Sequence, residues 1–372
     1  MGQTRPRYGC IIGLVSAHAN SPQKAMQVRL KAKNQTYVVE VDEGESILHA
    51  GLRQGIELPF GCATGTCGSC RVTCIEGRCS SNWPDAPGVR VGRHGPSDIL
   101  MCQCIPHEDM TVETGAIVYR SDPGACSPRY GVGRVAEIRE LAPDIIEFGL
   151  ELDAPMSFDA GQFVALEAPG IPGYRAYSMT RFARSTSRID FLLKRKSGGG
   201  FSEWIFKGAR PGAELKVFGP IGRATFSPSA GKHLLVIAGG SGIAGMMSIL
   251  DRAMQEGYFH RHRGHIFFGV RTWRDRFYLD EFARIKDAFP ENVSVTIAFS
   301  DEDVSGHANA DYPQLRFARG FVHEVAASEM TGKYANIRAY VAGPPPAVDA
   351  TLRYLVRDAK LPPTEIRYDK FG

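Results

Sequence analysis

The sequence predicts a multidomain chain that joins α+β and α/β architecture. A cysteine-rich loop at 61–70 lies among strand patterns and one helix pattern, which indicates a small α+β domain. Closely spaced strand patterns in residues 130–228 predict an antiparallel β-barrel, and strands alternating with helices from Lys232 onward predict a doubly wound parallel sheet. The 372 residues are enough for two or three such domains.

The cysteine loop carries the most specific pattern in the chain. Cys62, Cys67 and Cys70 stand at the spacing C-x4-C-x2-C, by which a plant-type loop wraps a [2Fe–2S] cluster. Thiolates are the soft anionic ligands that such clusters need, and three glycines in the same loop let the backbone fold closely around the sulfides. The loop therefore predicts an electron-transfer protein.

The fourth thiolate must come from outside this loop. Cys102 is the first candidate, because the 31 residues that separate it from Cys70 are enough for a strand, a turn and a return. Cys104 stays open as the second candidate, since residues 102 and 104 point to the same side of an extended segment. Cys74 and Cys79 lie too near Cys70 to close the far side of the cluster, and we interpret them as ordinary thiols.

Zinc and disulfides are the alternative uses of these cysteines. Zinc sites favour paired C-x2-4-C arms, and only one such arm is present. Disulfide frameworks are typical of short secreted chains with an even cysteine count, whereas this long chain has nine. The pattern favours the iron–sulfur cluster.

Composition and charge exclude several function classes. Hydrophobic residues at 43% and charged residues at 23% are typical of an ordinary globular protein. No run of 18 apolar residues predicts a membrane span, and no Lys/Arg block with interleaved aromatics predicts nucleic-acid binding. Residues 26–118 carry a formal charge of −3 and residues 119–372 carry +4, a difference small enough to be solvated surface.

Residues 1–26 are expected to form an N-terminal extension, either disordered or upstream of the natural start. Arg5, Arg7 and the apolar run Cys10–Val15 imitate a secretory signal, but that run is short and interrupted by Gly13. Iron–sulfur assembly and nicotinamide reductants belong to the cytoplasm. We therefore expect a cytoplasmic protein.

The small domain is expected at residues 27–118. Gln27–Ala32 and Tyr37–Val41 alternate as strands, and Ser46–Gln54 is typical of a helix opened by a serine cap. Two strands, a helix, the cluster loop and late strands resemble the β-grasp ferredoxin fold. Residues 119–129, rich in Gly, Pro and Ser, predict a linker.

The barrel region, residues 130–228, contains one extended segment with three chemically useful side chains. Arg175 suits a phosphate, Tyr177 suits a flat heterocycle, and Ser178 suits the polar edge of that heterocycle. Taken alone, the segment is equally an ordinary strand with a surface arginine.

A glycine-rich turn follows the same strand region. Gly198, Gly199 and Ser202 precede a predicted helix, Glu203–Lys207, whose free amides suit a pyrophosphate. Alone, this turn is equally an ordinary glycine turn. The two patterns together are much more specific than either is alone.

The region 229–372 begins with a nucleotide-type turn. A buried strand, Leu234–Ala238, runs into the turn Gly239–Gly245 and a helix, Met246–Gln255, and the turn matches G-x-G-x-x-G. The acidic ribose ligand expected about 20 residues later is missing, because His265 stands there and Arg271 ends the next strand. The site therefore differs from that of a standard dinucleotide dehydrogenase.

Residues 27–372 resemble the reductase components of bacterial multicomponent oxygenases, such as benzoate dioxygenase reductase and the reductases of diiron monooxygenases. The domain order of that family is ferredoxin, flavin domain, nucleotide domain, which implies FAD rather than FMN. The resemblance implies these cofactor-binding residues: Arg175, Tyr177, Ser178, Gly198, Gly199, Ser202, Gly239, Gly240, Ser241, Gly242, Arg271, Asp275, Gly343 and Pro344. It places Ser178, Ser300 and Phe371 at the reacting centre, with Asp369 beside Phe371 near the flavin face.

Three features depart from the family pattern. Ala342 stands where the family usually has a cysteine beside the nicotinamide, and Ser197 replaces a customary proline. The interval from Cys70 to Cys102 is about two residues longer than in ordinary plant-type ferredoxins. The inserted-looking region 82–97 is a candidate to reshape the edge that faces a partner.

The resemblance implies a reductase active in aromatic hydrocarbon catabolism. Electrons pass from NADH as hydride to FAD, then singly through the cluster to a terminal oxygenase, of the Rieske or diiron kind, or to a small ferredoxin. Relatives with a similar Arg271-Thr pair and Asp275 use NADH, and we expect a monomer. The alternative is a redox-sensing or binding iron–sulfur protein with a vestigial nucleotide domain, which the intact flavin and nucleotide motifs disfavour.

Overall fold

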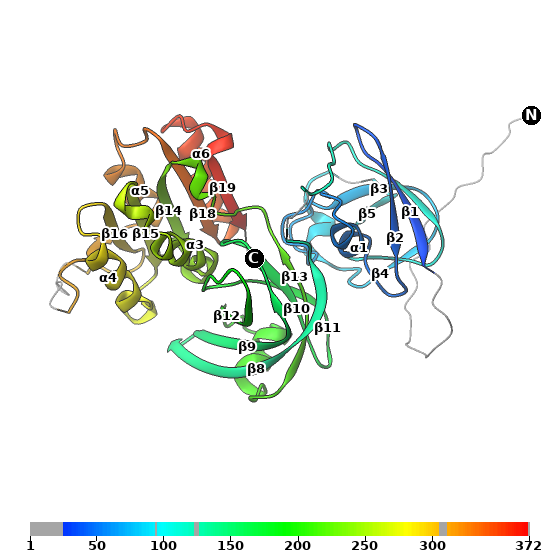
Figure 1. Ribbon diagram of the computed structural model, residues 1–372, viewed down its shortest axis with the longest axis horizontal. Helices are drawn as coiled ribbons and strands as arrows, with labels where there is room; N and C mark the ends of the chain where they lie inside the picture. The colour runs from blue at the N-terminus through cyan, green and yellow to red at the C-terminus, as the bar shows by residue number, and fades with distance from the viewer. Residues whose placement is uncertain (1–24, 94, 123–125, 305–310, 371–372) are drawn as a thin grey trace, which may run out of the picture. The chain divides into compact units, whose positions relative to one another are not determined.

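A computed structural model describes residues 25–93, 95–122, 126–304 and 311–370 (Figure 1). The chain divides into two compact units. The first contains Met1–Arg129 with Pro172–Ala176, and the second contains Tyr130–Ile171 with Tyr177–Gly372. No helix among the described residues has the length and apolar character that a bilayer span requires.

The first unit is built on a five-stranded sheet in the order β2-β1-β7-β3-β5. Its elements are β1 (Met26–Lys31), β2 (Thr36–Val41), α1 (Ile47–Arg53), β3 (Arg71–Glu76), β4 (Cys79–Ser81), β5 (Asp98–Leu100), β6 (Cys104–Pro106) and β7 (Met110–Glu113). The first strands pair antiparallel, and β1 pairs parallel with β7. Alternating buried residues on β1 and β2 bury one face of the sheet, as their sequence pattern predicts.

Helix α1 begins where the serine cap was expected. The Ser46 hydroxyl accepts the His49 amide at 3.3 Å, and the helix ends at Arg53 with Gln54 as C-cap. The cluster loop follows this helix directly. It therefore starts from a fixed point in the core.

The second unit opens with a six-stranded sheet in the order β11-β10-β13-β8-β9-β12. Its elements are β8 (Arg129–Ala142), β9 (Ile145–Met156), β10 (Phe163–Ala168), β11 (Ile171–Ser178), β12 (Thr186–Lys194), α2 (Gly200–Lys207) and β13 (Glu214–Ile221). An antiparallel bridge joins Met179, just after β11, to Phe191 on β12. Because these strands are the two ends of the sheet, the bridge curls it into a barrel.

The rest of the second unit is a parallel sheet in the order β17-β16-β15-β14-β18-β19. Its strands are β14 (His233–Gly239), β15 (Gly264–Val270), β16 (Val293–Phe299), β17 (Arg316–Arg319), β18 (Ile337–Gly343) and β19 (Ile366–Lys370). Its helices are α3 (Ile243–Gln255), α4 (Leu279–Ala288), α5 (Val322–Glu329) and α6 (Pro345–Arg357).

Both faces of the parallel sheet are covered. Ile249 of α3 and Phe282 of α4 pack in one hydrophobic cluster with alternate residues of the central strands, and that cluster continues into the barrel. Val325 of α5 and Leu355 of α6 belong to a second cluster on the other face. A doubly wound sheet places the carboxyl ends of its strands together, which is where such folds bind nucleotides.

The expected fold class is confirmed, while several element boundaries differ. Helix α3 begins at Ile243 rather than Met246, and α2 begins at Gly200 rather than Glu203. In both cases a glycine lies in the first helical turn: Gly200 in α2 and Gly245 in α3. The low helix propensity of glycine predicts a later start. The expected N-terminal extension lies almost wholly outside the described residues, apart from Ala25 and Met26.

Candidate functional site

The cluster loop is held in an unusual backbone conformation. Ala63 has φ +58°, in the left-handed region that non-glycine residues rarely adopt. The His49 side chain, from α1, hydrogen-bonds to the Ala63 backbone. Burial lowers the pKa of His49 to about 3, so the imidazole is neutral in the folded protein. A buried neutral histidine thus supports the strained point of the loop.

The four predicted ligand sulfurs stand as two pairs. The Cys70 and Cys102 sulfurs are 3.3 Å apart, and the thiols of Cys62 and Cys67 are within hydrogen-bonding distance of each other. No three His, Cys, Asp or Glu side chains converge on a single ion site in the described ranges. Two pairs fit a binuclear cluster, in which each iron takes two protein thiolates.

Backbone amides point at these sulfurs. The Cys62 sulfur accepts amides from Thr64, Thr66 and Cys67 at 3.3–3.4 Å. The Cys67 thiol and these donors lower the pKa of Cys62 to about 4. The pKa of Cys102 is raised instead, chiefly by its hydrogen bond to Cys70 and by burial. So many thiols together cannot all ionise without a positive charge, which iron supplies.

The turn before β6 explains why Cys102 rather than Cys104 meets the loop. Residues 101–103 form a turn fixed by the Met101 amide on the Cys70 carbonyl at 3.1 Å, so the segment is not extended as the second alternative required. Cys104 begins strand β6, opposite Ser81. Cys74 lies on β3 and Cys79 begins β4.

Strand β11, which carries Arg175 and Tyr177 and which we call the flavin strand, ends at Ser178 with a buried hydroxyl. Ser178 is 5% exposed, and its Oγ has no hydrogen-bond partner among the described residues. Leaving such a hydroxyl unsatisfied costs about 1–3 kcal/mol, so it indicates a missing partner. A Cβ placed on Gly245 of α3 would lie 3.4 Å from this oxygen. The flavin strand and the nucleotide turn therefore meet at Ser178.

The glycine loop reaches the same strand. The Tyr177 and Phe201 rings lie 5.0 Å apart, so β11 and α2 share one face. Ser202 closes the loop on itself, because its hydroxyl accepts the Lys196 amide at 3.1 Å and lies 3.1 Å from the Gly199 carbonyl. Arg175, two residues before Tyr177 and thus on the same side of the strand, donates to the Tyr174 carbonyl at 3.0 Å. These residues fit a flavin nucleotide that needs a phosphate contact and a ring surface.

At the nucleotide site, the Gly240–Gly242 turn lies against the end of β18. A Cβ on Gly242 would lie 2.6 Å from the Gly343 Cα, so only glycine permits this approach. Pro344 then caps α6 with its ring near Gly239. Two turns with free amides therefore meet at the carboxyl edge of the sheet, which fits a dinucleotide pyrophosphate.

The loop after β15 is acidic as well as basic. Arg271 forms an ion pair with Asp275 at 3.1 Å, and Asp275 also accepts from the Thr272 amide and hydroxyl. The Trp273 amide donates to Glu302 at 2.6 Å. The guanidinium of Arg271 is therefore already engaged by a carboxylate.

Three expected residues lie at or beyond the ends of the neighbouring strands. Ser300 follows β16 and donates to the Asp301 carboxylate at 2.7 Å. Asp369 stands beside Ala342 in the register of β18 and β19, and loss of hydration raises its pKa to about 7. Phe371 lies outside the described residues.

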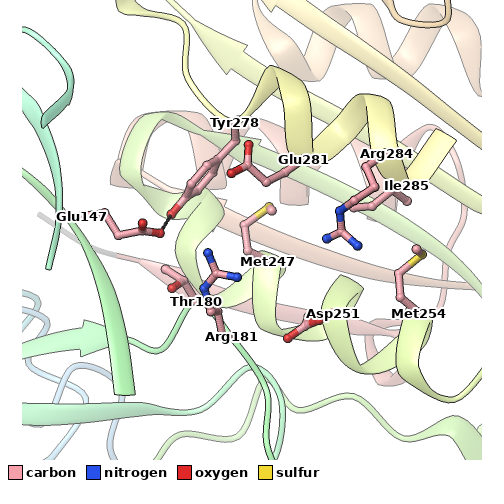
Figure 2. A pocket seen from close by; sticks show the side chains of 10 residues that line it. All are labelled: Glu147, Thr180, Arg181, Met247, Asp251, Met254, Tyr278, Glu281, Arg284 and Ile285. Atoms are coloured by element: carbon pink, nitrogen blue, oxygen red, sulfur yellow. Dashed lines mark hydrogen bonds between the residues drawn. The ribbon is translucent and has the colours of Figure 1, made fainter. Parts of the chain in front are cut away.

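Buried contacts fix the barrel against the nucleotide sheet. The Tyr278 hydroxyl, at the start of α4, donates to Glu147 of β9 at 2.8 Å (Figure 2). The Gly161 amide donates to Ser248 of α3 at 2.8 Å. A small pocket opens between these elements, lined by Glu147, Thr180, Arg181, Met247, Asp251, Met254, Tyr278, Glu281, Arg284 and Ile285. Two hydrogen bonds, Tyr278–Glu147 and Gly161–Ser248, thus join the barrel to the helices of the nucleotide sheet.

Fold and site together define an iron–sulfur flavoprotein oxidoreductase. Three family descriptions match in order along the chain. The "2Fe-2S iron-sulfur cluster binding domain" covers residues 30–107, the "Oxidoreductase FAD-binding domain" covers 133–226, and the "Oxidoreductase NAD-binding domain" covers 236–353. The chain therefore binds a [2Fe–2S] cluster, FAD and NAD(H), as expected from its sequence.

Known proteins of similar length give the family. "Ferredoxin--NAD(P)(+) reductase CarAd" of Metapseudomonas resinovorans is 32% identical, over 88% of this chain and 95% of its own. The ferredoxin--NAD(+) reductase component of the alkene monooxygenase system of Xanthobacter autotrophicus is 33% identical over the same shares. The structure titled "Ferredoxin reductase in carbazole 1,9a-dioxygenase" is 31% identical, with a TM-score of 0.79 over 95% of this chain and all of that one.

This chain belongs to the family of reductase components of multicomponent oxygenases. It is an NAD(P)H-dependent oxidoreductase, as the sequence predicts.

Two supporting residues escaped sequence analysis. His49 falls inside the expected helix Ser46–Gln54, where a histidine among buried helix positions is a signal for a specific contact. Ser248 carries no motif, and its role at the seam depends on the three-dimensional meeting of α3 with the barrel.

Proposed function

We propose that this chain is the NADH-dependent reductase of an oxygenase system, delivering single electrons to a terminal oxygenase or a small ferredoxin. The observation that carries the proposal is the buried Ser178 hydroxyl, unpartnered and facing Gly245, because it joins the flavin strand to the nucleotide turn. Relatives named as phenol 2-monooxygenase and alkene monooxygenase reductase components support such a partner. We further infer a cytoplasmic monomer, with domains at 27–118, 130–228 and 229–372.

Each set of residues has its own task in this proposal. When bound, NADH supplies hydride, FAD accepts it and releases electrons singly, and the cluster carries one electron at a time. Cys62, Cys67, Cys70 and Cys102 hold the cluster. The loop amides stabilise the negative charge on the sulfurs.

Arg175 and the start of α2 bind the phosphates of the flavin nucleotide, and Tyr177 packs on its ring. Ser178 donates its hydroxyl to the polar edge of that ring. The amides of Gly240–Gly242 and the turn at Gly343 bind the pyrophosphate of the nicotinamide nucleotide. The hydrogen bonds of Tyr278 and Ser248 fix the flavin-binding barrel in position against the nucleotide-binding sheet.

The preference for NADH follows from the loop after β15. Arg271 is paired with Asp275, and the Trp273 amide is bonded to Glu302, so two carboxylates stand among the arginines of this loop and repel a 2′-phosphate. NADH has only a hydroxyl at that position.

The test is steady-state kinetics on the purified protein with FAD and cluster loaded. We expect NADH to reduce ferricyanide and a one-electron protein acceptor, with a larger kcat/KM for NADH than for NADPH. Loaded protein that oxidises neither nucleotide would exclude the reductase and favour the sensing alternative. A kcat/KM for NADPH equal to that for NADH would overturn the nucleotide preference alone.

A further inference from the structure

The first unit contains a segment that supplies no cluster ligand. Residues 82–97 run from β4 to β5 and include one short 3-10 helix, Pro87–Arg90. This region lies between Cys70 and Cys102 and contains no cysteine, so it supplies no ligand sulfur.

The segment packs directly on the cluster loop. The Gly88 amide donates to the Gly65 carbonyl at 2.8 Å, and a Cβ on Gly88 would lie 2.6 Å from that oxygen. A Cβ on Gly68 would lie 3.3 Å from the Cβ of Val91. Residues 88–91 therefore lie against the backbone between the ligand cysteines.

One arginine fixes the shape of the segment. The guanidinium of Arg71, on β3, donates to the carbonyls of Gly88 at 2.6 Å, Val89 at 3.1 Å and Val91 at 3.0 Å. The two N–H groups of Arg71 Nη2, one of them shared between two carbonyls, hold that turn ready before any partner binds, which lowers the entropic cost of association.

The segment also determines the charge beside the cluster. Residues 59–70 contain no charged side chain, and the segment brings Asp85, Arg90 and Arg93. Both arginines are exposed and make no hydrogen bond or ion pair to the parts of the chain that the structure describes. Val91 between them is 49% exposed. We name Arg90, Val91 and Arg93 the basic ridge.

The ridge lies beside the part of the cluster loop that solvent reaches. Cys62, Cys70 and Cys102 are buried, whereas Cys67 is partly exposed and Ser69 is exposed. Val91 lies near Gly68, which stands between those two accessible residues, since a Cβ added at Gly68 would be 3.3 Å from the Val91 Cβ. Unpaired arginines beside an apolar side chain are the composition found at protein interfaces.

We propose that the basic ridge is the docking surface for a protein electron acceptor with an acidic face. The proposal rests on the proposed function and names the surface and charge of its partner. One electron leaves the reduced cluster and enters the acceptor, so the cluster is oxidised as the acceptor is reduced. The ridge attracts the acidic face and orients it over Cys67.

The test uses the full chain with Arg90→Glu and Arg93→Glu together. The matched control, Arg29→Glu with Lys31→Glu, makes the same charge change on exposed residues of β1. The probes are cytochrome b5, an acidic one-electron carrier, and cytochrome c, a basic one. The cluster is reduced with dithionite, so the result does not depend on NADH. Binding of oxidised cytochrome b5 is measured by calorimetry on the same samples.

At low ionic strength, the ridge variant should transfer electrons to cytochrome b5 at least about tenfold more slowly and bind it more weakly, because repulsion replaces steering. Transfer to cytochrome c should become faster. Both differences should shrink as salt rises to about 0.1 M, where the Debye length is about 10 Å. Arg90→Gln with Arg93→Gln, which removes charge without adding any, should give a smaller change in the same direction.

Equal effects of the ridge and control variants on cytochrome b5 would overturn the proposal. It would also be overturned if the glutamine variant, with its cluster absorbance intact, bound cytochrome b5 as tightly as the parent protein. A ridge variant that slows cluster reduction by NADH but not transfer to cytochrome b5 would assign the surface to internal transfer instead. Failure of NADH to reduce the parent protein would overturn the proposed function. It would not affect the docking test, because dithionite reduces the cluster there.

Discussion

The cluster loop and the flavin–nucleotide site are built in opposite ways. Three of the four proposed cluster ligands lie within nine residues, and the loop's own amides surround them. The second site is assembled from β11, α2, the turn at Gly240 and the end of β18, which lie far apart in the sequence. The first site is therefore encoded locally, and the second depends on packing between the barrel and the parallel sheet.

Because of this difference, we expect substitutions in the two sites to have different effects. We expect loss of a ligand cysteine to remove the electron outlet and to leave the motifs of residues 177–242 in place, because those residues belong to the second unit. Damage at Ser178 or at the seam affects binding surfaces from two folds at once. The predictions below test this contrast.

The largest effect is expected from Cys102→Ser. Loss of one thiolate should abolish the rhombic signal of the reduced [2Fe–2S] cluster in electron paramagnetic resonance and stop transfer to cytochrome c. NADH-driven ferricyanide reduction should persist, since that acceptor takes electrons from flavin directly. Cys104→Ser is the matched control, because Cys104 begins strand β6 opposite Ser81 and is not one of the proposed ligands. A signal that survives Cys102→Ser and disappears in Cys104→Ser would show that the ligand assignment is wrong.

The second prediction compares two buried serines that flank Gly245. Ser178→Ala should lower the rate of NADH-driven flavin reduction about tenfold, the value of one hydrogen bond, yet stabilise the FAD-free protein by roughly 1 kcal/mol. Ser248→Ala should destabilise that protein, because its hydroxyl accepts from Gly161 and donates to Gly245, both at 2.8 Å.

Thermal unfolding of FAD-free protein and stopped-flow reduction of loaded protein measure the two effects. Equal destabilisation by both substitutions would contradict an unpartnered Ser178 hydroxyl.

The third prediction concerns pH and His49. Its pKa is lowered from 6.5 to about 3, so the folded state takes up a proton less readily than the unfolded state. The unfolded state therefore gains a proton below pH 6.5 that the folded state does not bind. As pH falls from 6.5 toward 3, this difference lowers the free energy of unfolding. From about pH 8 to pH 5.5 this loss is about 1.4 kcal/mol for a single such group.

His49→Gln should remove that part of the pH dependence, measured as the free energy of unfolding at both pH values with iron content followed in parallel. An unchanged pH dependence in the variant would mean that His49 is accessible to protons in the folded state.

The smallest effect is expected from Asp275→Asn. Freeing Arg271 from an exposed ion pair should raise kcat/KM for NADPH relative to NADH by about threefold, in line with the modest energy of such pairs. Asp153→Asn, an exposed substitution on β9, is the control. No change in the NADPH to NADH ratio would mean that the carboxylate does not control the 2′-position.

The sequence predicts those features whose residues lie close together along the chain. The cysteine spacing, the strand with Arg175, Tyr177 and Ser178, and the glycine turn at 239–242 predicted the cofactors, the fold class and the family. The choice between Cys102 and Cys104 stayed open because it depends on the turn at 101–103, which is fixed by a bond to the Cys70 carbonyl.

Other features depend on tertiary contacts that no local pattern reports. The support of Ala63 by His49 requires α1 to pack behind the loop, and the meeting of Ser178 with Gly245 requires the barrel to close on α3. The expected linker began at Tyr119, yet Tyr119 and Ser121 hydrogen-bond to Glu57 and Gly55 of the first unit. The Gly-, Pro- and Ser-rich composition of this segment predicts a linker, but it does not predict the hydrogen bonds that its first residues make.

The central claim is that electrons enter the locally encoded site only through the dispersed one. Stopped-flow spectroscopy of the intact protein mixed anaerobically with NADH tests it most directly, because flavin and cluster absorb differently. We predict that flavin bleaching precedes or matches cluster reduction, and that protein stripped of FAD shows no cluster reduction by NADH. Cluster reduction by NADH in the stripped protein would contradict the account.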